Sequence, residues 1–141
     1  MKVEMPIILI SIENDGFHLM IKAKINGSKV NLLIDTGASR TVFDINRMKN
    51  IINFDKSEKN ERMSAGLGTN TMESQIAMID KLEFSKIKIK KYPSVFIDMS
   101  HVNEMYESIK LPLIDGFLGS DLLLKMKAVI NYKKKSLTLI I

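Results

Sequence analysis

Short stretches of alternating apolar and polar residues, each closed by a turn signal, recur along most of this 141-residue chain. Residues 17–25 follow the period of two that marks a half-buried strand. Asp15-Gly16 precedes this stretch and Asn26-Gly27 follows it, and both dipeptides favour tight hairpin turns. Residues 30–34 are more continuously apolar, which predicts a strand buried on both faces. Many short strands at regular spacing favour a closed all-β fold.

The rest of the chain continues this rhythm without a repeat or an interdomain linker, so residues 1–141 are expected to form a single domain. Helices are expected over residues 100–109 and from Gly119 or Ser120 to about Met126, and Asp44 is a candidate cap for a short helix through Asn50. Further strands are expected over residues 5–13, 41–43, 72–84, 87–90, 95–97, 128–132 and 137–141, with a hairpin tip at 65–70.

The amino-acid composition excludes several kinds of functional site. The chain has no cysteine, which excludes disulfides, thiol catalysis and cysteine-based zinc sites. Its two histidines are His18, interpreted as a structural strand residue, and His101, interpreted with Glu104 as a surface pair. We therefore expect no metal and no cofactor. The apolar N-terminal run contains Glu4 and reads as a strand rather than a signal peptide, and no segment is long enough to span a membrane, so a cytoplasmic location is expected.

The formal net charge is +5 and the sequence pI is about 9.4, which leaves a nucleic-acid-binding β-barrel as one alternative. The excess charge lies in short lysine clusters at residues 86–91 and 133–135, whereas the chain has three arginines. Nucleic-acid binding favours arginine or aromatic neighbours for such lysines. The clusters are better interpreted as solvated strand faces and a turn, so no nucleic-acid partner is expected.

The segment most informative about chemistry is Leu32-Leu33-Ile34-Asp35-Thr36-Gly37-Ala38-Ser39. A carboxylate directly after three apolar residues is unusual, because burial penalises its charge unless it gains partners or a proton. Thr36 supplies a hydroxyl next to it, and Gly37 allows a tight turn that brings a backbone N–H close to the carboxylate. The segment is suited to hold one carboxylate rigidly at the floor of a cleft.

Asp-Thr-Gly-Ala-Ser at residues 35–39, placed after an apolar strand, resembles the active-site motif of aspartic proteases. Phe117-Leu118-Gly119, followed by a short helix and a last strand, resembles the apolar-apolar-glycine element that these proteases place against the catalytic loop. Gly66-Leu67-Gly68 is the candidate tip of the flap. The resemblance covers about residues 17–141 and is closest to single-domain bacterial retropepsin-like proteins, also through segments 98–104 and 115–123.

This resemblance implies a retropepsin-like closed β-barrel, the acid protease fold, with a flap hairpin and one or two short helices. It implies an aspartic endopeptidase that binds a peptide or protein substrate. Asp35, Thr36 and Gly37 are then the catalytic residues. Ala38 and Ser39 contribute to substrate binding together with the flap residues Gly66, Leu67 and Gly68. Ser39-Arg40 and the long stretch from Pro93 to Pro112 depart from the viral pattern.

The number of Asp-Thr-Gly motifs in the chain is informative about quaternary structure. Aspartic protease chemistry needs two facing carboxylates, and this chain has one Asp-Thr-Gly. Asp115-Gly116 lacks the Thr or Ser and is interpreted as a turn. The second carboxylate is therefore expected from an identical chain across a two-fold axis, in a homodimer. The alternative is a catalytically silent peptide- or protein-binding module with the same fold.

Overall fold

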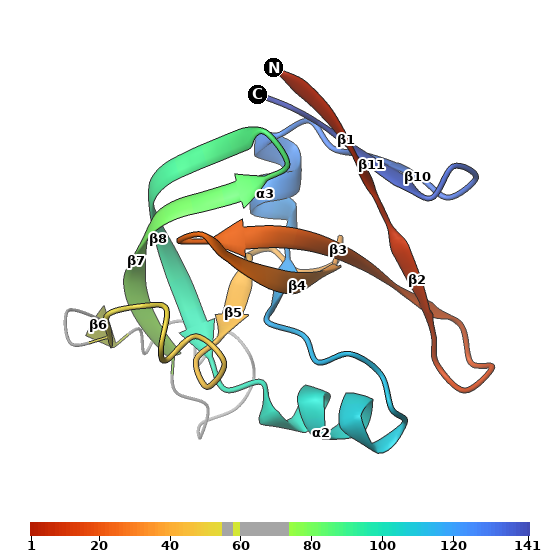
Figure 1. The fold of residues 1–141 in the computed structure, drawn as a ribbon, viewed down its shortest axis with the longest axis horizontal. Helices are drawn as coiled ribbons and strands as arrows, with labels where there is room; N and C mark the ends of the chain where they lie inside the picture. The colour runs from red at the N-terminus through yellow and green to blue at the C-terminus, as the bar shows by residue number, and fades with distance from the viewer. Residues whose placement is uncertain (55–57, 60–73) are drawn as a thin grey trace.

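The computed structural model describes residues 1–54, 58–59 and 74–141, and these residues form strands with two helices (Figure 1). The helices are α2 Ser100–Ser108 and α3 Ser120–Lys125. The strands are β1 Lys2–Pro6, β2 Ile8–Ser11, β3 Phe17–Ile25, β4 Ser28–Ile34, β5 Val42–Asp44, β6 Glu58–Lys59, β7 Ser74–Phe84, β8 Ile87–Ile97, β9 Gly116–Leu118, β10 Val129–Asn131 and β11 Ser136–Ile140.

The larger sheet closes into a barrel, as the sequence predicts. Its strand order is β2-β3-β4-β9-β5-β8-β7-β6, and a further pairing of β3 with β7 joins the two sides. The closed ring therefore runs β3-β4-β9-β5-β8-β7 and back to β3. Strand β9 lies parallel to β4 and antiparallel to β5, so the end of β4 and the end of β9 meet at one place.

The two faces of the barrel wall carry two separate apolar clusters. Ile21 and Leu32 point into the barrel interior with the main core, whereas Met20 and Leu33, their chain neighbours, belong to the second cluster. That second cluster includes Tyr106 from α2, so this helix covers part of the outer face of the barrel. Both neighbouring leucines of β4 are buried, which confirms the prediction that this strand is buried on both faces.

A smaller sheet of order β1-β11-β10 joins the two ends of the chain (Figure 1). The single strand predicted over residues 5–13 was wrong, because this run contains two strands that belong to different sheets. Strand β1 pairs with β11, whereas β2 pairs with β3. Ile7 lies between them, and its backbone N–H donates to the carbonyl of Lys135 at 2.8 Å, which carries the chain from one sheet to the other.

Two other local predictions need correction. Residues 45–51 form successive turns rather than the helix expected after Asp44. Asp44 is nonetheless buried, and its carboxylate accepts the backbone N–H groups of Arg47 at 3.2 Å and Met99 at 3.0 Å. Residues 87–97 form one strand instead of two short ones. The hairpin turn at Asn26-Gly27 is confirmed, with φ of 50° and 85° at the two residues.

Helix α2 is tied to the chain that follows it by a buried amide. The side chain of Asn103 donates to the carbonyl of Ile114 at 3.0 Å and accepts from the N–H of Ile114 at 2.8 Å. Buried backbone groups need such partners, because no water replaces them. Asn103 therefore fixes the segment that leads directly into β9.

Replacing Asn103 with Ala should lower the free energy of unfolding by about 1–3 kcal/mol, because both backbone groups of Ile114 lose their partner. Urea unfolding followed by circular dichroism measures this change. Glu104→Ala, at an exposed neighbouring position on the same helix, is the matched control and should have little effect. Equal stability of the two variants would contradict the role given to Asn103.

Candidate active site

Asp35 lies directly after β4, where the chain turns out of the barrel wall. Its backbone N–H donates to the carbonyl of Leu118 at 2.9 Å, which continues the β4–β9 pairing by one residue. Its carboxylate Oδ1 accepts the N–H of Gly37 at 3.1 Å, and its carbonyl accepts the N–H of Ala38 at 3.2 Å. The loop thus folds back on Asp35 and holds the carboxylate from the backbone, as expected for Gly37.

The other side of this loop is fixed by the junction between β9 and α3. Ser120 donates its N–H to the carbonyl of Ala38 at 2.8 Å, and Gly119 donates to Thr41 Oγ1 at 2.9 Å. Asp121 then accepts both the N–H of Thr41 at 2.9 Å and its hydroxyl at 2.7 Å. Thr41 and Asp121 are site-building residues that the sequence interpretation did not single out. Their position beside the two recognised motifs is the signal that could have found them.

Gly119 is required here by space. A Cβ at this position would lie 2.6 Å from the carbonyl carbon of Arg40 and 2.9 Å from the nitrogen of Thr41. Backbone atoms cannot move aside as the end of a flexible side chain can. Gly37 differs, since a Cβ there would meet Asp35 Oδ1 at 3.5 Å, an ordinary contact distance.

A pocket of about 290 Å³ opens beside the carboxylate. Asp35 and Thr36 form part of its wall. The remaining lining comes from four places in the sequence: the start of β3, the end of β4, the middle of β9, and β10 with the turn that follows. Its other lining residues are Phe17, His18, Leu19, Leu33, Ile34, Phe117, Ile130 and Tyr132. The pocket offers both apolar and polar surface next to Asp35.

The exposure of the predicted catalytic residues differs along the loop. Asp35 is half-buried, whereas Thr36 and Gly37 are exposed to solvent. Ala38 is half-buried and Ser39 is exposed, and neither lines the pocket beside Asp35. Gly66, Leu67 and Gly68, predicted as the flap tip, lie outside the described residues. Among the residues that line the pocket, Asp35 is the single carboxylate.

The structure also places Asp115 and His18, two residues considered in the sequence analysis. Asp115 is 4% exposed, accepts the N–H of Asn31 at 2.7 Å and pairs with Arg47 Nε at 2.6 Å, so it braces β4 from within the fold. His18 is placed in the pocket with Asp35, which the interpretation as a purely structural strand residue did not foresee. Its Nδ1 is hydrogen-bonded to the hydroxyl of Tyr106.

Over the described ranges, no three His, Asp or Glu side chains gather closely enough to hold a metal ion. Likewise, neither α2 nor α3 has the length and apolar character of a membrane-crossing helix.

Comparisons with known proteins agree with this geometry. The sequence model of the aspartyl protease family matches residues 21–122, a span that includes both the Asp35 loop and Gly119. The chain therefore belongs to the aspartyl protease family. A search of the curated proteins finds no match.

Three solved structures share the fold at low sequence identity. A retropepsin-like aspartic protease from Rickettsia conorii is 20% identical with a TM-score of 0.59, and the match covers 99% of this chain and 90% of that one. The retroviral protease-like domain of Ddi1 from Leishmania major is 15% identical with a TM-score of 0.54, covering 86% and 87%. EIAV protease in complex with the inhibitor HBY-793 is 16% identical with a TM-score of 0.51, covering 86% and 99%. The fold is that of a retropepsin-like protease.

The same substitution should destabilise the protein at Gly119 and have little effect at Gly37. Gly119→Ala should lower the free energy of unfolding by about 1–3 kcal/mol, because its Cβ would overlap the peptide group between Arg40 and Thr41. Gly37→Ala should change it by less than about 0.5 kcal/mol, because the position is exposed and has space for the methyl group. Urea denaturation of both variants measures the difference, and a Gly119→Ala protein as stable as wild type would contradict the packing described.

Proposed function

We propose that this protein is an aspartic endopeptidase that works as a homodimer, with residues 1–141 of each chain forming one domain. The observation that carries the proposal is the Asp35 carboxylate, held by the N–H of Gly37 and open to a pocket, in a chain of the aspartyl protease family. Asp35, Thr36 and Gly37 are the proposed catalytic residues. The chemistry needs no metal and no cofactor.

The proposed mechanism uses the Asp35 carboxylates of two chains. As is established for aspartic proteases, two close carboxylates share one proton, since both cannot ionise cheaply. The ionised Asp35 acts as general base on a water molecule, which attacks the carbonyl carbon of the scissile peptide bond. The protonated Asp35 of the second chain polarises the carbonyl oxygen. When the C–N bond breaks, the leaving amine takes up a proton from the pair of Asp35 carboxyl groups.

Three features support a second chain. The described residues that line the pocket beside Asp35 include one carboxylate, whereas the chemistry requires two. Thr36 is exposed beside it, a position from which its hydroxyl can bond to a second copy. In addition, β1 and β10 each pair only with β11 in the described sheet, which leaves one edge of each strand for an added strand.

The proposed substrate is an extended peptide. A strand-like peptide can bond to the protein through its main chain while alternate side chains enter pockets. The pocket beside Asp35 is one such subsite. Ala38 and Ser39 follow Asp35 in the same loop and are the proposed contacts for the peptide main chain. From the resemblance in sequence, we propose that Gly66, Leu67 and Gly68 belong to a flap that closes over the bound peptide and excludes water.

Replacing Asp35 with Asn should abolish peptide cleavage, because the amide cannot act as the base, while leaving the fold intact. A peptide library digested by wild type and variant, with products identified by mass spectrometry, measures this. Asp80→Asn removes an exposed carboxylate from β7 and should cleave like wild type. Cleavage retained by the Asp35→Asn protein would end the proposal.

The dimer predicts a particular response to mixing. Where wild-type and Asp35→Asn chains are mixed equally at fixed total concentration, random pairing leaves about a quarter of the dimers with two intact carboxylates. Activity should therefore fall to about a quarter of the wild-type value, provided that the chains exchange freely. Titrating the fraction of variant chain while recording initial rates tests this. A linear fall to half at equal mixing would show that each chain acts independently.

A further inference from the structure

The pocket beside Asp35 is lined by both apolar and polar side chains. Leu19, Leu33, Ile34, Phe117 and Ile130 supply aliphatic and aromatic surface, and Phe17 adds its ring. Besides Asp35 and Thr36, the polar side chains of the lining are Tyr132, which is 67% exposed, and the half-buried His18. Outside the proposed catalytic loop, His18 is therefore the less exposed of the two polar side chains that line the pocket.

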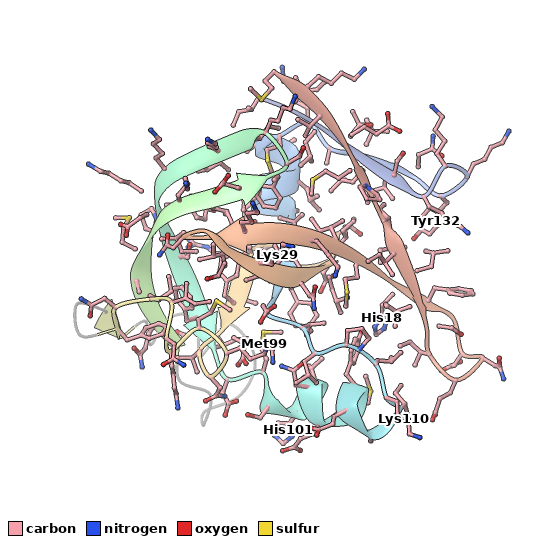
Figure 2. All side chains as sticks on the ribbon, viewed as in Figure 1. His18, Lys29, Met99, His101, Lys110 and Tyr132 are labelled. Atoms are coloured by element: carbon pink, nitrogen blue, oxygen red, sulfur yellow. The ribbon has the colours of Figure 1, made fainter. Side chains whose placement is uncertain are left out.

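His18 is held in position by helix α2. Its Nδ1 is hydrogen-bonded to the hydroxyl of Tyr106, and the two rings stack at 21° with their centres 5.8 Å apart. Figure 2 shows the labelled His18 between the β2–β3 hairpin and α2. Tyr106 itself is fully buried, so the phenol ring cannot move aside without disturbing the cluster under the helix.

The direction of this hydrogen bond follows from the environment of the phenol. Burial raises the pKa of Tyr106 to about 12, so the hydroxyl keeps its proton at neutral pH. In the described part of the chain, His18 Nδ1 is the partner found for that hydroxyl. A phenol that only accepted from the ring would leave its own buried O–H without an acceptor, which is costly. Tyr106 therefore donates to Nδ1, and this bond favours the tautomer of the His18 ring that carries its proton on Nε2.

From this arrangement we propose that His18 is a specificity-determining residue of the pocket, whose Nε2–H donates to an oxygen at the tip of a substrate side chain. The side chain that fits combines an apolar stem with a terminal acceptor, as glutamine and glutamate do. The stem packs on the aliphatic wall and the oxygen meets His18. This inference rests on the proposed peptidase function, and Tyr106 is a positioning residue that acts through His18.

The Nε2–H donor of His18 also disfavours other substrate side chains in this pocket. Lysine and arginine carry donors alone, so they would face the Nε2–H without an acceptor. Methionine has nearly the stem length of glutamine but offers only a weak sulfur acceptor. A site built to bond a polar group loses affinity for an analogue that leaves the protein group unpaired. Glutamine should therefore be preferred over methionine in this pocket by about five- to tenfold in kcat/KM.

The test compares peptides that differ only by Gln or Met, substituted in turn at each position around a cleaved bond. Wild type should prefer Gln at one position by about five- to tenfold. His18→Leu should lose that preference, and Tyr106→Phe should weaken it, because the ring no longer has a fixed tautomer. His18→Gln, whose amide restores a donor, should keep part of it. His101→Leu, which removes the other histidine from an exposed site on α2, should match wild type.

An unchanged Gln/Met ratio in His18→Leu would overturn the inference, and so would an equal loss of kcat/KM for both peptides, which indicates a structural role. Thermal melting curves check that each variant is folded. If wild type cleaves no peptide, the proposed function fails instead. The pocket is then tested by the affinity of the same peptide pairs for the Asp35→Asn protein, where equal Kd values would overturn the role of His18.

Discussion

The backbone contact between the Asp35 loop and the β9–α3 junction is the constraint on which the rest of the structure depends. Gly119 packs against the carbonyl of Arg40 so closely that no Cβ fits, and Ser120 and Leu118 bond to the loop on either side. Because β4 and β9 pair in parallel, this contact sets where Asp35 leaves the barrel. The barrel, the pocket and the orientation of the carboxylate follow from one close approach of two chain segments.

Helix α2 adds a second layer to this arrangement. It covers the outer face of the barrel wall, where Tyr106 packs with Met20 and Leu33, and it reaches the pocket through His18. Asn103 fixes the segment between α2 and β9. The long stretch that separates this chain from the viral pattern thus supports the same strands that carry Asp35, and it also positions a pocket side chain.

The sequence predicted the parts of this molecule that depend on local pattern. The alternation of apolar and polar residues predicted β3, and Asn26-Gly27 predicted the turn that follows it. The two motifs at residues 35–37 and 117–119 predicted a loop held against β9. Alternation could not show that the run from Met5 to Glu13 changes sheets at Ile7, since both halves are apolar and extended. It also could not show that Tyr106 bonds to His18, because the two residues are 88 positions apart.

Large separations in sequence between contacting residues also affect how the chain folds. The partners of the loop lie far along the chain, with Asp121 80 residues after Thr41 and Gly119 78 residues after it. Contacts between such distant segments require closure of a long loop of chain and form slowly. During synthesis, the Asp35 loop can gain these bonds only after Gly119 and Asp121 have left the ribosome. In a nascent chain shorter than this, Asp35 is therefore present without the hydrogen bonds that fix its loop.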